Sequence, residues 1–351
     1  MSGRLRVALI LPVRNEAASV ESTLGAICAA TRLPDRIVVA DGASTDGTPE
    51  LLRAFAARVG APVEVVDNPQ IFAGGGRNVG AAAARDADIL VFADFGNAPE
   101  ANWLEHMVAP FEADPTIEVV ASPVMPAPRT EFGRAVAAIL HNRQLRLAQE
   151  PEGQREGLLR RSTTPGGLSL AIRQATWQRM CGMPGWLRAA EDKLFGRKLA
   201  ARGIPFTMAW QTAMRYHMRE NFRDLLHQHY VYGRGDGQSG YMRNAFLRTL
   251  AVWVVLVGLL SAGAWTLAAP LAALVLFGAY IWRRGVRHMV RAEGQGPTLR
   301  QVRLAILVVL GHDLGVLAGY AVGWSQWLFK PRFRHLQRAY MSAGGADGEG
   351  V

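Results

Sequence analysis

Two kinds of apolar pattern alternate over the first hundred residues of the chain. Continuous apolar runs, which are typical of strands buried on both faces, occupy residues 6–13, 36–41, 63–68 and 88–94. Segments with helical spacing lie between them, at residues 19–31, 47–60 and 76–87. Strands that alternate with helices in this way predict an α/β fold, with a mostly parallel sheet covered by helices on both faces.

The C-terminal part of the chain is far more apolar. Residues 249–282 contain no charged residue, and residues 304–329 contain a single one, Asp313. One helix over the first run would be about 50 Å long, against a hydrocarbon core of about 30 Å. Because Pro270 lies just past the midpoint, we expect a helical hairpin there.

Basic clusters follow both apolar runs, "RRGVRHMVR" after the first and "KPRFRHLQR" after the second. Such clusters prefer the cytoplasmic side of a membrane. If both are cytoplasmic, the second run is expected to be re-entrant, interfacial or another hairpin. The alternative is that both runs are buried helices of a soluble domain.

These patterns divide the chain into three parts. We predict an α/β domain over residues 1–235, a membrane-associated helical region over residues 236–341 and a disordered tail over residues 342–351. Residues 1–150 contain 13 Arg and 18 acidic residues, whereas the remainder contains 26 Lys or Arg and 11 acidic residues. Such a basic half suits nucleic acid, phosphates or an anionic membrane surface.

Two cysteines far apart exclude a disulfide framework and a cysteine-rich zinc site. The first apolar run is too short for a secretory signal, so we expect the N-terminal part to stay in the cytoplasm.

Polar residues gather where the predicted strands end. The carboxyl ends of parallel strands share one edge of the sheet, and here they carry "PVRNE", "DGASTDG" and Asp94. The second of these segments fails the calcium-loop pattern and could be a simple connection with Asp46 or Thr48 as the helix N-cap. "GGGRNVG" has the wrong glycine spacing for a dinucleotide-binding dehydrogenase and follows the third strand rather than the first.

Taken together, these segments resemble the family 2 inverting glycosyltransferases, which have the GT-A fold. The resemblance covers roughly residues 6–235 and rests on five segments in order: "LPVRNE", "VVADGASTDGT", "GGGRNVGAAAA", "FADFGNAPEANWLE" and "AEDKLFGRKLAARG". With "YVYGRGDG" and the C-terminal apolar runs, the chain is also similar to glucosyltransferases of succinoglycan-type exopolysaccharide assembly.

The resemblance implies roles for particular residues. Pro12, Glu16 and Asp41 would line the nucleoside pocket, where Asp41 accepts a hydrogen bond from the base N–H. Arg77 would contact the base or the phosphates. Asp94 matches the first Asp of the family's Asp-x-Asp, which holds a divalent cation, and Asp192 matches the general base.

Gly96 departs from this pattern, because the second Asp would stand there. One carboxylate is a weak site for Mg²⁺ or Mn²⁺, so we expect a second ligand, and His217 is the candidate. The alternatives are that His217 only packs or hydrogen-bonds, and that Gly96 leaves room for the donor sugar.

The resemblance also implies an acceptor side. Gly166 and Gly167 would let the acceptor approach the backbone, and Trp186 would stack on a sugar or pack in the core. Arg234 is a candidate for contacting the diphosphate or is a solvated surface residue. Val231 and Tyr232 replace the Arg and Trp of processive synthases, which favours addition of a single sugar.

The expected activity is therefore transfer of one sugar from a nucleotide sugar, most commonly a UDP-sugar in the family, with inversion. A cytoplasmic enzyme with its own hydrophobic anchor is expected to use a lipid-linked acceptor, such as a polyprenyl-diphosphate sugar, at the inner (plasma) membrane, and no nucleic acid. Five arginines would suit the lipid's phosphates: Arg160, Arg161, Arg215, Arg219 and Arg223. A non-catalytic membrane scaffold and a nucleotidyltransferase that makes nucleotide sugars are the alternatives, although "PVRNE" lacks the glycines and Lys expected of the latter.

Overall fold

The structure is a computed structural model that describes residues 4–151, 165–294 and 296–344. The chain divides into two compact units. The first comprises Met1–Met125, Glu150–His217 and His335–Val351, and the second comprises Pro126–Gln149 and Met218–Arg334. The boundary expected at residue 235 falls inside helix α10 (Phe222–Gln238), which belongs to the second unit. Residues 345–351 of the expected tail and Arg160 and Arg161 lie outside the described residues.

A seven-stranded sheet forms the centre of the first unit, in the order β3-β2-β1-β4-β8-β6-β9. Its strands are β1 (Val7–Val13), β2 (Arg36–Asp41), β3 (Val63–Asp67), β4 (Ile89–Ala93), β6 (Val119–Ala121), β8 (Ser169–Arg173) and β9 (Thr207–Met208). All neighbouring pairs are parallel except the two that involve β8. The mostly parallel α/β sheet predicted from the apolar runs is therefore confirmed.

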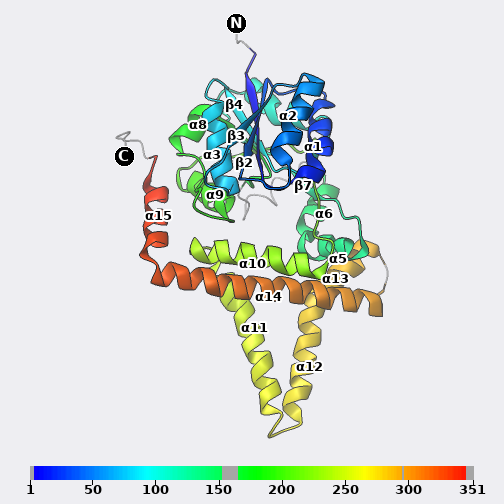
Figure 1. Cartoon of the computed structure of the whole chain (residues 1–351). Coiled ribbons are helices and arrows are strands. Elements are labelled where there is room, and N and C mark those ends of the chain that lie inside the picture. The colour runs from blue at the N-terminus through cyan, green and yellow to red at the C-terminus, as the bar shows by residue number, and fades with distance from the viewer. Residues whose placement is uncertain (1–3, 152–164, 295, 345–351) are drawn as a thin grey trace. The chain divides into compact units, whose positions relative to one another are not determined.

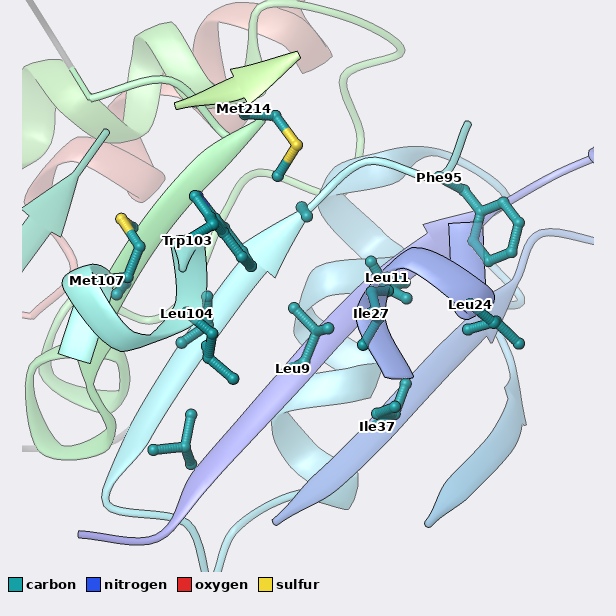
Figure 2. Packing of buried hydrophobic residues seen from close by; sticks show 14 of the residues in the cluster. Leu9, Leu11, Leu24, Ile27, Ile37, Phe95, Trp103, Leu104, Met107 and Met214 are labelled. Atoms are coloured by element: carbon teal, nitrogen blue, oxygen red, sulfur yellow. The ribbon is translucent and has the colours of Figure 1, made fainter. Parts of the chain in front are cut away.

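Helices cover both faces of this sheet (Figure 1). They are α1 (Val20–Cys28), α2 (Thr48–Val59), α3 (Ala73–Ala83), α4 (Trp103–Ala113), α8 (Gln174–Arg179) and α9 (Glu191–Ala201). Successive residues of a strand face opposite sides, so β1 serves two cores. Leu9 and Leu11 pack with Leu24 of α1 (Figure 2), whereas Ile10 lies in the other core with Trp177 of α8.

A three-stranded sheet carries the chain back toward the end of β4. It has the order β5-β10-β7, with β5 at Ala98–Pro99, β10 at Met214–Tyr216 and β7 at Val124–Pro126. Antiparallel pairing sets Arg215 opposite Ala98 and Met214 opposite Pro99. The residue after β10, His217, is thereby brought beside the turn that follows β4.

The second unit is helical. It consists of α5 (Glu131–Leu140), α6 (Asn142–Gln149), α10, α11 (Arg243–Ala262), α12 (Ala268–Ile281), the π-helical turn η2 (Trp282–Val286), α13 (Arg287–Glu293) and α14 (Leu299–Phe329). Helices α10 and α14 lie side by side (Figure 1). Glycines form the seam: a Cβ added at Gly319 or Gly323 would overlap the backbone of α10 at Tyr230 or Arg234. Small residues thus allow the two helix backbones to approach closely.

Helices α11 and α12 form the predicted hairpin, which projects away from α14 (Figure 1). Its turn lies at residues 263–267, and Pro270 lies in the first turn of α12, where its missing N–H leaves no helical hydrogen bond unmade. Apolar side chains of the hairpin are largely exposed, including Trp265, Leu267 and Val275.

Two helices of the described residues, α11 and α14, are long and apolar enough to cross a membrane. In α14, 44% of the apolar window is buried, against 11% in α11, because α14 is also the packing partner of α10. The second apolar run forms this one continuous helix, so the expectation that it could be another hairpin is wrong.

Candidate active site

A buried arginine joins two acidic segments at the carboxyl edge of the sheet. Arg77, on α3, is 1% exposed. Its Nη2 donates a hydrogen bond to Asp94 Oδ1 at 2.5 Å, and its Nη1 donates to Glu191 Oε1 at 2.7 Å. Asp94 directly follows β4, and Glu191 is the first residue of α9. One guanidinium therefore holds the Asp94 and Glu191–Asp192 segments together.

Glycines allow α3 to present Arg77 in this way. The segment "GGGRN" forms the first turns of α3, which begins at Ala73, three residues before the helix start expected at residue 76. A Cβ at Gly76 would lie 2.9 Å from Pro12 Cβ, and one at Gly74 would lie 2.9 Å from the Pro184 carbonyl oxygen. Glycine is a poor helix former, but here it is required by the close packing of the helix start.

The role expected for Arg77 needs correction. Contact with a base or phosphate would require an accessible guanidinium, whereas this one is enclosed and already paired with two carboxylates. Burial alone would lower the pKa of Arg77, but the charges of Asp94, Glu191 and Asp192 raise it above its ordinary value. Arg77 is thus a permanently charged brace between the acids.

Glu191 and Asp192 are neighbours with different surroundings. Burial, and then the charge of Asp192, raise the pKa of Glu191 to about 7, although Arg77 opposes the shift. Asp192 is only half-buried, and its Oδ2 accepts a hydrogen bond from the Gly167 N–H at 3.3 Å. A Cβ at Gly166 would lie 3.7 Å from the same oxygen. The residue expected to act as base and the glycines expected on the acceptor side therefore lie together.

Gly167 is required at its position by Arg77. A Cβ added there would lie 2.7 Å from the guanidinium carbon of Arg77, which its two carboxylate partners hold in place. The partnership of Arg77 with Glu191 was not predicted from the sequence. The sequence feature that could have indicated this partnership is Glu191, the additional acid in "AED" next to the expected base.

The residues expected to line the nucleoside pocket lie on β1, on β2 and in the loop after β1. Asp41 ends β2, and its Oδ2 accepts the Ser44 N–H at 3.1 Å. Its other oxygen, Oδ1, is buried and has no hydrogen-bond partner among the described residues. Leaving a buried acceptor unpaired costs free energy, and a donor from a ligand would remove that cost. This geometry fits the predicted hydrogen bond from a base.

Glu16 lies in the loop after β1, close to the turn that follows β4. Its carboxylate accepts the Ser19 hydroxyl at 2.7 Å, and its N–H donates to Thr48 Oγ1 at 2.9 Å. A Cβ added at Gly96 would lie 3.1 Å from the Glu16 carboxylate. Gly96 also has φ +80°, a left-handed conformation that favours glycine. Both observations explain why no Asp stands at this position.

His217 lies at the same turn. Its Nδ1 is 2.8 Å from the Gly96 carbonyl oxygen, and its backbone N–H donates to Asn97 Oδ1 at 3.2 Å. A carbonyl accepts, so Nδ1 carries the proton and Nε2 is the nitrogen able to ligate a metal. His217 therefore hydrogen-bonds in a way that also suits a ligand.

The side chains at this turn fit a cation that binds together with the phosphates of a substrate. Among the described residues there is no group of three or more His, Cys, Asp or Glu side chains that could hold a metal. Asp94 keeps 39% of its side chain exposed. Mg²⁺-like ions are commonly held by one or two protein ligands, with substrate phosphates and water completing the shell. Asp94 and His217 are the candidates for such a partial shell.

The remaining predicted residues are spread over the molecule. Trp186 is half-buried in the segment before α9. Arg215 pairs with Glu100 at 3.4 Å. Arg234 belongs to the second unit, where its Nε donates to Gln326 Oε1 at 3.4 Å. Arg219 and Arg223 are exposed in that unit.

Comparison with known proteins shows which family and fold this chain resembles. Residues 8–179 match the family model described as glycosyl transferase family 2. The chain is 25% identical over 259 residues to glycosyltransferase AglE of Haloferax volcanii, covering 72% of this chain and 81% of AglE. It is 25% identical over 233 residues to succinoglycan biosynthesis protein ExoA of Rhizobium meliloti, covering 66% and 69%.

Among solved structures, the fold is similar to mannosyltransferase PcManGT of Pyrobaculum calidifontis, determined in complex with GDP-Man and Mn²⁺. The TM-score is 0.58 at 20% identity, and the match covers 89% of this chain and 88% of PcManGT. The chain is therefore a glycosyltransferase whose N-terminal part is a family 2 domain with the GT-A fold.

Proposed function

We propose that the protein transfers one sugar from a nucleotide sugar to a lipid-linked acceptor, with inversion at the anomeric carbon. The observation that carries this proposal is the position of Asp192, whose carboxylate lies against Gly166 and Gly167 while Arg77 ties its segment to Asp94. The segment that carries the proposed base and the carboxylate proposed for the donor diphosphate are thereby joined through one buried side chain.

In the proposed reaction, Asp192 takes the proton of an acceptor hydroxyl. The hydroxyl oxygen forms a bond to the anomeric carbon on the face opposite the diphosphate. The carbon–oxygen bond to the diphosphate breaks, and its electron pair leaves with the nucleoside diphosphate. A positioned base contributes about 10²- to 10⁴-fold to such a reaction. The Gly167 N–H orients the carboxylate for this task.

At the donor end, Asp41 is proposed to accept a base N–H through its unpartnered Oδ1. Pro12 lies on the neighbouring strand, paired with Ala40, and Glu16 lies in the loop after that strand. Asp94 and His217 would hold Mg²⁺ or Mn²⁺. When bound, such an ion neutralises charge on the leaving diphosphate. The complex of PcManGT with GDP-Man and Mn²⁺ supports a nucleotide sugar and a divalent cation. A UDP-sugar is the donor proposed first, because uridine is commonest in the family.

We place the acceptor on a lipid at the cytoplasmic face of the inner membrane. The exposed apolar hairpin supports membrane association, as do the basic residues that follow it. The name of ExoA supports a role in polysaccharide synthesis. We also propose Arg234 as a diphosphate contact and Trp186 as an acceptor-side residue.

The test is a donor screen with purified full-length protein and a membrane lipid extract. UDP-, GDP- and dTDP-sugars are supplied in turn with Mn²⁺, and transfer of label into the lipid phase is measured. One donor should label the lipid in the wild type but not in Asp192→Asn. A parallel incubation with nucleoside triphosphate and sugar phosphate checks the alternative, since release of diphosphate there would identify a nucleotidyltransferase. If no donor labels the lipid phase, the remaining alternative is a non-catalytic membrane scaffold.

A further inference from the structure

A cavity in the second unit is lined mainly by cationic side chains. Its volume is about 310 Å³. Arg283 and Arg284 come from η2, and Arg287 and His288 from α13. Asn142, at the start of α6, adds a neutral polar group. Ile139, Leu140 and Val309 complete the lining with apolar surface.

The cavity lies where the apolar hairpin gives way to polar chain. Helix α12 ends at Ile281, and the π-helical turn follows without a break. Its first residue, Trp282, is exposed, and tryptophan is the residue typical of a membrane–water interface. Arg283 comes directly after it. If the hairpin enters a bilayer, the cavity therefore lies at the level of the lipid headgroups.

Packing holds the wall of the cavity in place. A Cβ added at Gly285 would lie 2.7 Å from Ala305 Cβ, so the π-helical turn lies directly on α14. Arg284 Nη2 donates to Asp313 Oδ1 at 3.0 Å, and the Asp313 side chain is 0% exposed. Asp313 is also bonded by the Tyr280 hydroxyl at 2.5 Å. These contacts fix the direction of the Arg284 guanidinium.

Part of this guanidinium lacks an acceptor. Arg284 Nε is buried and has no hydrogen-bond partner among the described residues. The described ion pairs include no carboxylate within reach of Arg283 or Arg287. Burial, and then the charges of Arg287 and other nearby arginines, lower the pKa of His288, as expected where positive charge is in excess. The wall thus offers cations and a buried donor to an anion.

We propose that this cavity binds the phosphate group of a membrane lipid. Guanidinium groups recognise phosphate through paired N–H donors, and a volume of this size suits a headgroup phosphate or diphosphate. The apolar residues of the lining would contact the first part of the lipid chain. The proposal rests on the membrane association proposed above, but it requires neither a sugar donor nor the transfer reaction.

The test uses full-length protein in phosphatidylcholine nanodiscs. Three probes are added separately: phosphatidylglycerol, undecaprenyl phosphate and inorganic diphosphate. Binding of each is measured by native mass spectrometry. The double variant Arg283→Gln/Arg287→Gln is compared with Arg248→Gln/Arg303→Gln, which removes the same charge from exposed positions of α11 and α14. Binding of GDP and UDP with Mn²⁺ checks that the first unit stays intact.

We expect the cavity variant to lose at least about tenfold in affinity for a phosphate lipid, and the control variant less than about twofold. Equal losses in both variants would overturn the proposal, because general surface charge would then explain binding. Unchanged binding in the cavity variant would also overturn it, as would binding of diphosphate but of neither lipid. Preference between the two lipids identifies the source of the phosphate. Failure of all variants to enter nanodiscs would instead contradict membrane association, and donor binding without lipid binding would leave the catalytic proposal intact.

Discussion

His217 Nδ1 lies 2.8 Å from the carbonyl oxygen of Gly96, although the two residues are 121 positions apart in the chain. The antiparallel pairing of β10 with β5 creates this contact, because it aligns Arg215 with Ala98. The hydrogen bond holds the imidazole at the turn that follows Asp94. It also leaves Nε2 as the nitrogen that would ligate a cation.

Replacing His217 should therefore weaken the response to metal. In His217→Ala, we expect the Mn²⁺ concentration for half-maximal transfer to rise about 10- to 100-fold, as is typical when the surroundings of a metal site are disturbed. A Mn²⁺ titration of transfer measures this, with exposed His227→Ala as the control. An unchanged titration would mean that His217 only supports the turn.

Restoring the family's second acid at Gly96 should not improve metal binding. A φ of +80° is strained for any residue other than glycine, and the Cβ of the new residue would lie 3.1 Å from the Glu16 carboxylate. We expect Gly96→Asp to lower both transfer and the melting temperature, and Gly96→Ala to lower them less. Tighter Mn²⁺ dependence in Gly96→Asp would contradict this explanation.

Loss of the Asp192 carboxylate and loss of the Asp94 carboxylate should have different kinetic effects. Asp192→Asn should lower kcat by about 10²- to 10⁴-fold while leaving donor binding unchanged, since only the proton acceptor is lost. Asp94→Asn should weaken binding of the donor with Mn²⁺ as well. Steady-state kinetics and donor titration separate the two, with exposed Glu50→Gln as the control for lost charge. Full activity in both variants would remove these assignments.

Gly167 should tolerate no side chain. In Gly167→Ala, the added methyl would meet the braced Arg77 guanidinium at 2.7 Å, so we expect a loss of about 1–3 kcal/mol in stability and a marked loss of transfer. Gly25→Ala is the matched control, because nothing lies within 4 Å of its new Cβ and it stands inside α1. Thermal melting of both variants checks the difference, and equal melting temperatures would argue against a rigid brace.

The contribution of His141, which follows α5, to stability should fall in mild acid. Burial lowers the pKa of His141 to about 4 from an ordinary value of 6.5. Between these values His141 binds a proton more readily in the unfolded chain than in the folded one, so its contribution to stability falls as the pH falls. The loss should amount to about 1–3 kcal/mol. His141→Gln should flatten the change in melting temperature between pH 6.5 and 4.5, whereas exposed His227→Gln should not.

Local sequence was sufficient for the elements of the first unit. Strands such as β2 are buried on both faces, so their continuous apolar runs could be recognised without knowing their partners. The start of α3 was expected at residue 76, three residues later than in the structure. Gly74 disfavours a helix by intrinsic preference, and only its contact with Pro184 makes it suitable for a helix start.

The boundary expected at residue 235 falls inside helix α10 for a related reason. Hydropathy changes near that point, but helix α10 belongs with α14, which begins more than sixty residues later. The glycines of α14 that form the seam stand four positions apart, at Gly311, Gly315, Gly319 and Gly323, a spacing typical of closely packed helices. Their partner helix is visible only when the backbones of both helices are in place.

What the sequence determined by itself is the set of chemical groups: Asp41 and Asp94 at strand ends, Asp192 in the segment "AED", and the apolar hairpin that follows the α/β domain. These follow from short patterns of neighbouring residues. Tertiary structure decided their relationships. Arg77 became a brace rather than a ligand contact, and His217 reached Gly96, because burial and strand pairing depend on residues a hundred positions away, which no local pattern encodes.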